Sequence, residues 1–303
     1  MKEFFCAPLQ GFTDRFWREA HADFCRGEGL EPPRYCAPFA RVEKGVVRPR
    51  DLRDIDGDKV LPQAIFKNLA ELQTVADAVA SAGHSCLDLN LGCPFPPQIK
   101  AGRGAALVGK PDFMREVSEW MSTRPAMTFS IKMRPGVKEA HEWKEVVDII
   151  NSMPLSHVTV HPRTAVQGYK GETDLDTFSD MLSAITHPVI YNGNISTPEE
   201  AEEICTRFPR IKGIMIGRGI LARPTLYAEY RGKTYDASDR AEAWLDIMRA
   251  VSQEIAEVSA GDAQALMRLK PRLEYADEEL LGHKFLKSLK KSASLDKFLN
   301  ILG

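Results

Sequence analysis

Residues 85–94 have the sequence SCLDLNLGCP, a mostly apolar run that ends in glycine and proline. Such a run predicts a buried β-strand at residues 85–91 that passes into a loop. Further runs of this kind occupy residues 3–8, 34–38, 60–66, 127–133, 156–161, 188–192 and 211–216. Helical patterns separate most of them. Residues 69–79, for example, repeat apolar side chains at helical spacing between Asn68 and Gly83, which suit the two helix ends.

Eight strands that alternate with helices predict a parallel β/α fold. For a chain of 303 residues, the simplest solution is a closed (β/α)8 TIM barrel, which we place at residues 1–232. A doubly wound open sheet is the alternative, but no G-x-G-x-x-G follows the first strand. No strand pattern remains after the polar segment 231–239. We therefore expect a small all-helical domain at 238–303, with Ser238 capping one long helix and two or three helices after it.

Composition excludes several classes of protein. The six cysteines form no C-x-x-C pair, which argues against a zinc site and a disulfide framework, and we expect no metal. No apolar run reaches 18 residues, and the N-terminal apolar stretch is too short for a signal peptide. We therefore expect a cytoplasmic monomer with no membrane partner. The net charge is −2, but residues 264–297 hold eight Lys/Arg against five Asp/Glu.

The predicted strands end in polar residues. Catalytic groups of a TIM barrel lie on the loops at the carboxyl ends of its strands. Seven of the eight predicted strands contribute a polar side chain there, namely Gln10, Gln63, Asn90, Lys132, His161, Asn192 and Arg218. A barrel that binds no ligand needs none of these side chains, so the pattern predicts a binding site at this end of the barrel.

The residue types suggest the ligand. Gly193 and Gly217 follow the last two strands and let backbone N–H groups approach an anion, and Arg218 adds positive charge, so we expect a phosphate there.

The side chains of Gln63, Asn90 and Asn192 suit a heterocycle with alternating carbonyl and N–H groups. Lys132 would stabilise negative charge on that ring. Flavin mononucleotide (FMN) fits this description. Pyridoxal phosphate, with Lys132 as its Schiff base, fits the same residues and stays open at this point.

Six segments together resemble the tRNA-dihydrouridine synthases. They are residues 88–94 (DLNLGCP) with Gly102, Gly104 and Leu107; 7–9 (APL) with Gly11 and Asp14; 132–134 (KMR) with Gly136; 161–171 (HPRTAVQGYKG); 192–195 (NGNI); and 217–219 (GRG). The resemblance covers nearly all of residues 1–225. Two positions depart from the family pattern: Leu9 stands where the family usually has Met, and Asn194 where it has Asp or Glu.

The resemblance implies an oxidoreductase acting on CH–CH groups with NAD(P). In this family FMN, reduced by NADPH, reduces the C5=C6 bond of a specific uridine in tRNA. Hydride passes from flavin N5 to C6 of the base. A cysteine that matches Cys93 gives a proton to C5, which makes Cys93 a general acid and not an activated thiolate.

The resemblance also implies the other roles residue by residue. The matching cofactor-binding residues are Ala7, Pro8, Leu9, Gln63, Lys132, His161, Asn192, Gly193, Asn194, Gly217 and Arg218. The matching substrate-binding residues in the barrel are Asn90, Arg163 and Tyr169. Within these sets, Lys132 matches a lysine at the N1/O2 edge of the flavin, and Asn90 matches a contact to the uracil.

The tRNA partner requires a cationic surface. The target base must leave its stack at a cost of roughly a few kcal/mol, which phosphate contacts from Lys and Arg would offset. We expect these contacts from Arg268, Lys270, Lys284, Lys287 and Lys291. The last three are spaced i, i+3, i+7 and so share one helix face.

Two other functions compete with this interpretation. One is a dihydroorotate-dehydrogenase-like FMN enzyme, which would need neither the helical domain nor residues 161–164. The other is a catalytically dead tRNA-binding protein, against which Cys93, Lys132 and Asn90 argue.

Overall fold

The computed structural model describes residues 1–55, 57 and 59–303. Contacts divide the chain into two compact units. The first unit consists of Met1–Pro8, Arg34–Asn194 and Glu202–Met215. The second consists of Leu9–Pro33, Ile195–Ala201 and Ile216–Gly303.

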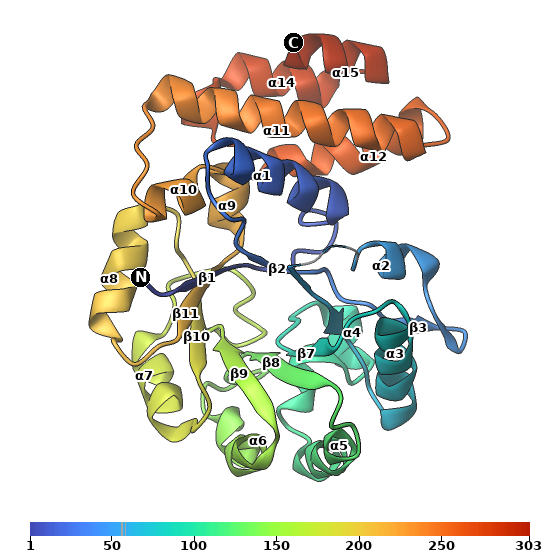
Figure 1. Cartoon of the computed structure of the whole chain (residues 1–303), viewed down its shortest axis with the longest axis vertical. Helices are drawn as coiled ribbons and strands as arrows, with labels where there is room; N and C mark the ends of the chain where they lie inside the picture. The colour runs from blue at the N-terminus through green and yellow to red at the C-terminus, as the bar shows by residue number, and fades with distance from the viewer. Residues whose placement is uncertain (56, 58) are drawn as a thin grey trace. The chain divides into compact units, whose positions relative to one another are not determined.

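A parallel β-barrel forms the centre of the first unit (Figure 1). Its strands are β1 (Glu3–Cys6), β2 (Arg34–Cys36), β5 (Val60–Leu61), β6 (Gln63–Ala64), β7 (Cys86–Leu91), β8 (Thr128–Met133), β9 (Leu155–Val160), β10 (Val189–Asn192) and β11 (Gly213–Ile216). They pair in the order β5-β2-β1-β11-β10-β9-β8-β7-β6. Each of the eight runs predicted from the sequence overlaps one or two of these strands.

Proline 62 explains why the sheet has nine strands where eight were expected. The predicted strand 60–66 is divided into β5 and β6 because Pro62 has no N–H to donate. The two halves lie at opposite ends of the pairing order. Ala37 N donates to Leu61 O at 3.0 Å on one side, and Asp88 N donates to Pro62 O at 2.8 Å on the other. This stretch therefore links both edges, and the predicted TIM barrel is confirmed as a nearly closed barrel.

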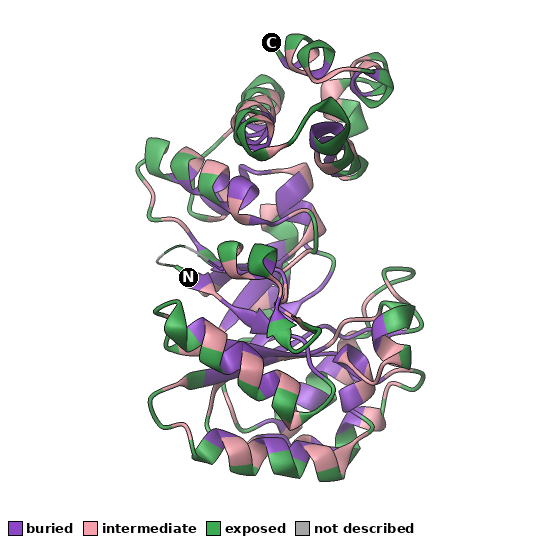
Figure 2. Ribbon diagram, turned by 90° about the vertical axis from the view of Figure 1, so that its right-hand side faces the viewer, coloured by how far each residue is buried: buried purple, intermediate pink, exposed green. Residues whose placement is uncertain are grey.

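Helices and short turns connect the strands of the barrel, with their buried sides facing the sheet (Figure 2). They are α2 (Pro49–Arg53), α3 (Leu69–Ser81), α4 (Pro96–Lys100), α5 (Pro111–Ser122), α6 (Val147–Ser152), α7 (Leu175–Ala184), α8 (Pro198–Arg207), the 3-10 turns η1 (Gly104–Leu107) and η2 (Glu142–Glu145), and the hairpin β3 (Val42–Glu43) and β4 (Val46–Val47). Helix α3 confirms the predicted pattern. Its N-cap Asn68 accepts from Glu71 N at 2.9 Å, and Gly83 follows its end with φ +91°.

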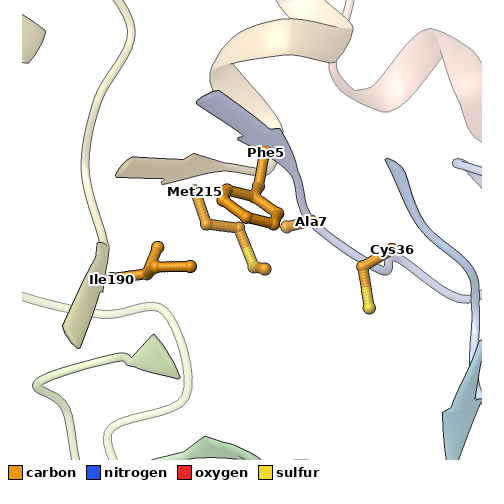
Figure 3. Close-up of a cluster of buried hydrophobic side chains, with 5 residues drawn as sticks. All are labelled: Phe5, Ala7, Cys36, Ile190 and Met215. Atoms are coloured by element: carbon orange, nitrogen blue, oxygen red, sulfur yellow. The ribbon is translucent and has the colours of Figure 1, made fainter. Parts of the chain in front are cut away.

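Apolar side chains fill the barrel on the side of its first and last strands. Phe5, Ala7, Cys36, Ile190 and Met215 form one buried cluster (Figure 3). These residues come from β1 and the residue that follows it, and from β2, β10 and β11. The buried polar side chains of Gln63, Asp88, Asn90, Ser130 and Thr159 lie on β6 to β9, and that of Asn192 lies at the end of β10.

The second unit is helical. It contains α1 (Arg15–Gly27), α9 (Arg218–Ala222), α10 (Leu226–Tyr230), α11 (Ala237–Val258), α12 (Asp262–Leu269), η3 (Lys270–Glu274), α13 (Glu278–Leu281), α14 (His283–Lys291) and α15 (Leu295–Leu302). Helix α1 packs against α11. The predicted cap Ser238 is wrong, because Asp236 caps α11 and forms a reciprocal capping box with Asp239. More helical segments follow than the two or three expected, since η3 and α13 interrupt the chain. The division into a catalytic barrel at residues 1–232 and a tRNA-binding helical domain at 238–303 stays a prediction.

None of the helices among the described residues is both long enough and apolar enough to span a bilayer.

Candidate functional site

A chain of hydrogen bonds crosses the interior of the barrel. Gln63 Nε2 donates to Asp88 Oδ2 at 2.7 Å, and Asn90 Nδ2 donates to Gln63 Oε1 at 2.7 Å. Asn90 Oδ1 then accepts from Cys93 N at 2.8 Å and from Gly92 N at 3.1 Å. The β6–β7 register, which places Gln63 opposite Asp88, builds the start of this chain. It connects the middle of the barrel to the loop that carries Cys93.

The two ends of this chain fix the direction of both amides. An ionised carboxylate only accepts and a backbone N–H only donates. Gln63 must therefore present its NH2 to Asp88, which leaves its carbonyl for Asn90. Asn90 must in turn present its carbonyl to the loop. Burial raises the pKa of Asp88 to about 6, while hydrogen bonds from Ser130 and Gln63 oppose that rise. At neutral pH the carboxylate is thus ionised and holds both amides in one orientation.

Cys93 lies in a tightly packed loop after β7. Gly104 has φ +60°, and a Cβ there would lie 2.8 Å from both Cβ and O of Cys93. Gly92 has slightly more room, since its Cβ would lie 3.3 Å from Lys132 O. Burial raises the pKa of the Cys93 thiol above its usual 9.0, although the Phe95 N–H and nearby cations oppose the shift. The thiol is therefore protonated at neutral pH and held in place.

Lys132 stands beside Asn90, because the β7–β8 register pairs the two residues. Its side chain is partly buried. Burial and then the charge of Arg134 lower the pKa of Lys132 to about 8, although Asp88 opposes this shift. No hydrogen bond or ion pair of the Lys132 ammonium involves any residue that the structure describes. The ammonium is thus a cation suited to an anionic ligand.

Two buried arginines organise the loop after β9. The Arg134 guanidinium donates to Thr164 O at 2.9 Å and lies over the Tyr169 ring at 5.6 Å. Arg163 donates to Gly171 O at 2.5 Å, to Asn194 Oδ1 at 2.9 Å and to His161 Nε2 at 3.2 Å. An arginine cannot accept, so Nε2 of His161 is the acceptor and the proton of this neutral ring is on Nδ1.

Arg163 is only 1% exposed, and its guanidinium holds the loops after β9 and β10 together. Its predicted contact with the substrate stays a prediction. Tyr169, in contrast, is 44% exposed. Asn194 has a positive φ of 24°, which asparagine tolerates better than most residues. Its carbonyl accepts from Arg163, so the departure from the family's acidic residue keeps an acceptor at this position.

The loops predicted to bind phosphate lie after β10 and β11. Asn192 is buried, and its amide donates to Met215 O at 2.7 Å, which ties β10 to β11. Gly193 is required by packing, because a Cβ there would lie 2.6 Å from Thr173 Cγ2. Gly217 and Arg218 belong to the second unit, where Gly217 precedes α9.

Among the described residues, no group of three or more His, Cys, Asp or Glu side chains is arranged to hold a metal ion.

The predicted residues near strand one have different surroundings. Ala7 lies in the apolar cluster. Pro8 follows it and is partly buried. Leu9 belongs to the second unit and begins a turn in which its carbonyl accepts from Phe12 N at 2.9 Å and Thr13 N at 3.0 Å.

The predicted tRNA-binding cations fall into two groups. Lys284, Lys287 and Lys291 are exposed on α14, while Leu286 and Leu289 are buried on its other side. The predicted face is confirmed as an exposed cationic surface, and RNA binding by it stays a prediction.

Arg268 and Lys270 are only partly exposed. Arg268 lies over the Phe16 ring at 4.7 Å and 3.7 Å from Asp14. It therefore also has a role in the packing of the second unit.

Sequence reasoning gave no role to Asp88, Ser130 or Arg134. Ser130 Oγ donates to Asp88 Oδ1 at 2.6 Å, and all three side chains are buried. One signal was available for Asp88, since it is the only charged residue within the apolar run 85–91.

Comparisons with known proteins agree on one family. The family model described as Dihydrouridine synthase (Dus) matches residues 5–278. A probable tRNA-dihydrouridine synthase of Treponema pallidum is 28% identical over 281 residues, which are 84% of this chain and 80% of that protein. A tRNA-dihydrouridine(16) synthase of Cupriavidus necator is 26% identical over 273 residues, 86% of this chain and 83% of the relative.

Solved structures share the barrel. A morphinone reductase aligns with a TM-score of 0.52 at 10% identity, over 76% of this chain and 86% of its own. The old yellow enzyme from Trypanosoma cruzi aligns with a TM-score of 0.50 at 11% identity, over 80% of this chain and 91% of its own. At such identities the likeness shows the fold alone.

Proposed function

The chain belongs to the dihydrouridine synthase family, and from this premise we propose that it reduces the C5=C6 bond of a uridine in tRNA to 5,6-dihydrouridine. The names of its relatives support tRNA as the substrate. The observation that carries the proposal is the hydrogen-bond chain from Asp88 through Gln63 and Asn90, which ends on the backbone of a protonated Cys93.

The donors and acceptors of the barrel fit FMN as the cofactor. Gln63 offers an amide of fixed orientation, which suits the alternating carbonyl and N–H groups of a flavin ring. The ammonium of Lys132 suits the N1/O2 edge, where a reduced flavin carries negative charge. FMN would be reduced by NADPH and would supply the hydride that adds to C6. His161, Asn192, Gly193, Asn194, Gly217 and Arg218 would complete its site.

Cys93 would deliver the proton that C5 requires. Its raised pKa keeps the thiol protonated at neutral pH, which is the state a general acid needs. Asn90 would contact the uracil while its carbonyl holds the Cys93 backbone, so one residue would position both the substrate and the acid. Tyr169 would lie beside the base. The lysine face of α14, together with Arg268 and Lys270, would bind tRNA phosphates.

The test is reconstitution of the full chain with FMN and NADPH, followed by incubation with a dihydrouridine-free tRNA transcript. We expect NADPH to bleach the flavin and dihydrouridine to form at a defined position. The same enzyme should not oxidise free dihydroorotate. Absence of flavin bands after reconstitution with excess FMN would contradict the cofactor, and flavin reduction without dihydrouridine would contradict the substrate.

A further inference from the structure

An exposed aromatic ring lies two residues after Cys93. Among the described residues, only two aromatic side chains are exposed, and Phe95 is the more exposed at 59%. The other, Tyr169, has the Arg134 guanidinium over its ring and the His161 ring 6.1 Å away. The Phe95 ring has no such contact: no ring or cation of the described part of the chain packs on it. Its apolar surface is thus left to water.

The backbone around Phe95 is unusually stiff. Pro94 precedes it, and Pro96 and Pro97 follow it at the start of α4. Proline fixes its own φ and restricts the residue before it. The carbonyl of Phe95 also accepts from Gln98 N at 2.9 Å and Ile99 N at 3.1 Å. The ring is therefore presented from a frame that loses little conformational entropy when a ligand binds.

The position of Phe95 relates it to the reacting base. Its backbone N–H is directed at the Cys93 sulfur. Because the two residues are only two positions apart, their Cα atoms lie within about 8 Å of each other. Strands β7 and β9, whose loops carry Phe95 and Tyr169, flank β8, which carries Lys132. Neighbouring strands lie about 4.8 Å apart, so the two loops that carry the exposed rings begin on one rim of the barrel, about two strand spacings from each other.

We propose that Phe95 is a stacking platform for a base of the tRNA that is adjacent to the reduced uridine, an inference that rests on the proposed function. A uridine that enters the barrel must leave its stack, and its neighbours then lose a stacking partner. Unstacked RNA bases bind aromatic side chains in this way. A stiff, solvent-facing ring next to the proton donor meets this need, whereas a ring used for packing would be covered.

The experiment is a cycle of protein and RNA changes with the FMN-loaded full chain. Wild type is first used to map the reduced uridine. The base on its 5′ or its 3′ side is then removed from the transcript, and kcat and KM are measured for wild type and Phe95→Ala. On intact tRNA, Phe95→Ala should raise KM about 5- to 150-fold, the usual effect of losing one stacked base. Removal of the stacked base should raise the KM of wild type similarly and that of Phe95→Ala by little.

Two further variants separate stacking from simple apolar contact. Phe95→Trp should keep the wild-type KM because it keeps a π face, and Phe95→Leu should resemble Phe95→Ala although it keeps apolar volume. Reduction of the flavin by NADPH without RNA should be equal in all four proteins. A KM of Phe95→Ala equal to wild type, a fully active Phe95→Leu, or additive effects at both flanking bases would overturn the proposal. If wild type forms no dihydrouridine, the proposed function itself fails and this proposal falls with it.

Discussion

The carboxylate of Asp88 gives a test of the amide chain that separates function from stability. Asp88→Leu keeps a similar volume but removes both acceptor oxygens. Gln63 Nε2 then loses its acceptor at 2.7 Å and keeps only the weak sulfur acceptor of Cys36 at 3.8 Å. The Gln63 amide is then oriented from the Asn90 end alone. A buried donor without a partner costs about 1–3 kcal/mol. We therefore expect FMN affinity and kcat/KM to fall about 5- to 150-fold.

The stability of the fold should change much less than its activity. The pKa of Asp88 rises from 3.8 to about 6 on folding, so at pH 7.5 ionisation of this buried group costs the folded state about 3 kcal/mol, at 1.36 kcal/mol per pKa unit. Asp88→Leu removes this ionisation cost, which offsets the stability lost with the hydrogen bonds of the carboxylate. The sign follows from linkage: the folded state binds the proton more tightly, so wild-type stability falls as pH rises from 3.8 through 6. Asp88→Leu should lack this dependence.

Asp88→Asn is the matched control. Its single carbonyl can still accept from Gln63, and the Ser130 hydroxyl can turn to accept from the new amide. FMN affinity, measured by quenching of flavin fluorescence, should then stay within a few-fold of wild type. Wild-type FMN affinity and turnover in Asp88→Leu would refute the role of the hydrogen-bond chain in orienting Gln63 and Asn90.

Three other outcomes follow from single sites. Lys132→Met should lower the reduction potential of bound FMN relative to wild type below about pH 8, where the ammonium is charged, and the difference should vanish above it; equal potentials at pH 7 would exclude this role. Replacement of Lys284, Lys287 and Lys291 by Ala should reduce the slope of log affinity for tRNA against log salt concentration by up to ~3 units. NADPH-driven flavin reduction should be unchanged. An unchanged slope would mean that tRNA does not bind this face of α14. Burial raises the pKa of Glu142, but three backbone N–H groups donate to its carboxylate and together lower the pKa below 4.5. Its stabilising effect is therefore present above pH 4.5 and is lost as pH falls below that value. Glu142→Gln should show a shallower acid dependence of Tm, and identical acid profiles would contradict this.

The strands could be predicted because burial on both faces leaves an apolar run in the sequence. Residues 85–91 and 127–133 match β7 and β8 to within one residue at each end. The division of the strand 60–66 could also be predicted from the sequence, because Pro62 has no N–H to donate. The start of α11 was harder to predict, because Asp236 and Ser238 are both good caps. Asp239, three residues after Asp236, completes the box and decides between them.

The site was predictable in its residue types but not in its connections. Gln63, Asn90 and Lys132 stand at strand ends, where a barrel exposes them to a ligand. The role of Asp88 depends on the β6–β7 register, which brings it beside a residue 25 positions away. The burial of Arg163 depends on acceptors at Gly171 and Asn194. Such long-range pairs leave no periodic signal in one sequence.

The proton donor offers the most direct test of the central claim. Pre-reduced wild type and Cys93→Ala are mixed with a dihydrouridine-free tRNA transcript, and dihydrouridine is followed over a single turnover. Cys93→Ala should retain FMN, accept electrons from NADPH and bind tRNA, yet form dihydrouridine about 10²- to 10⁴-fold more slowly, the usual contribution of a positioned general acid. Equal single-turnover rates would mean that another group protonates C5, and would contradict the assignment of Cys93.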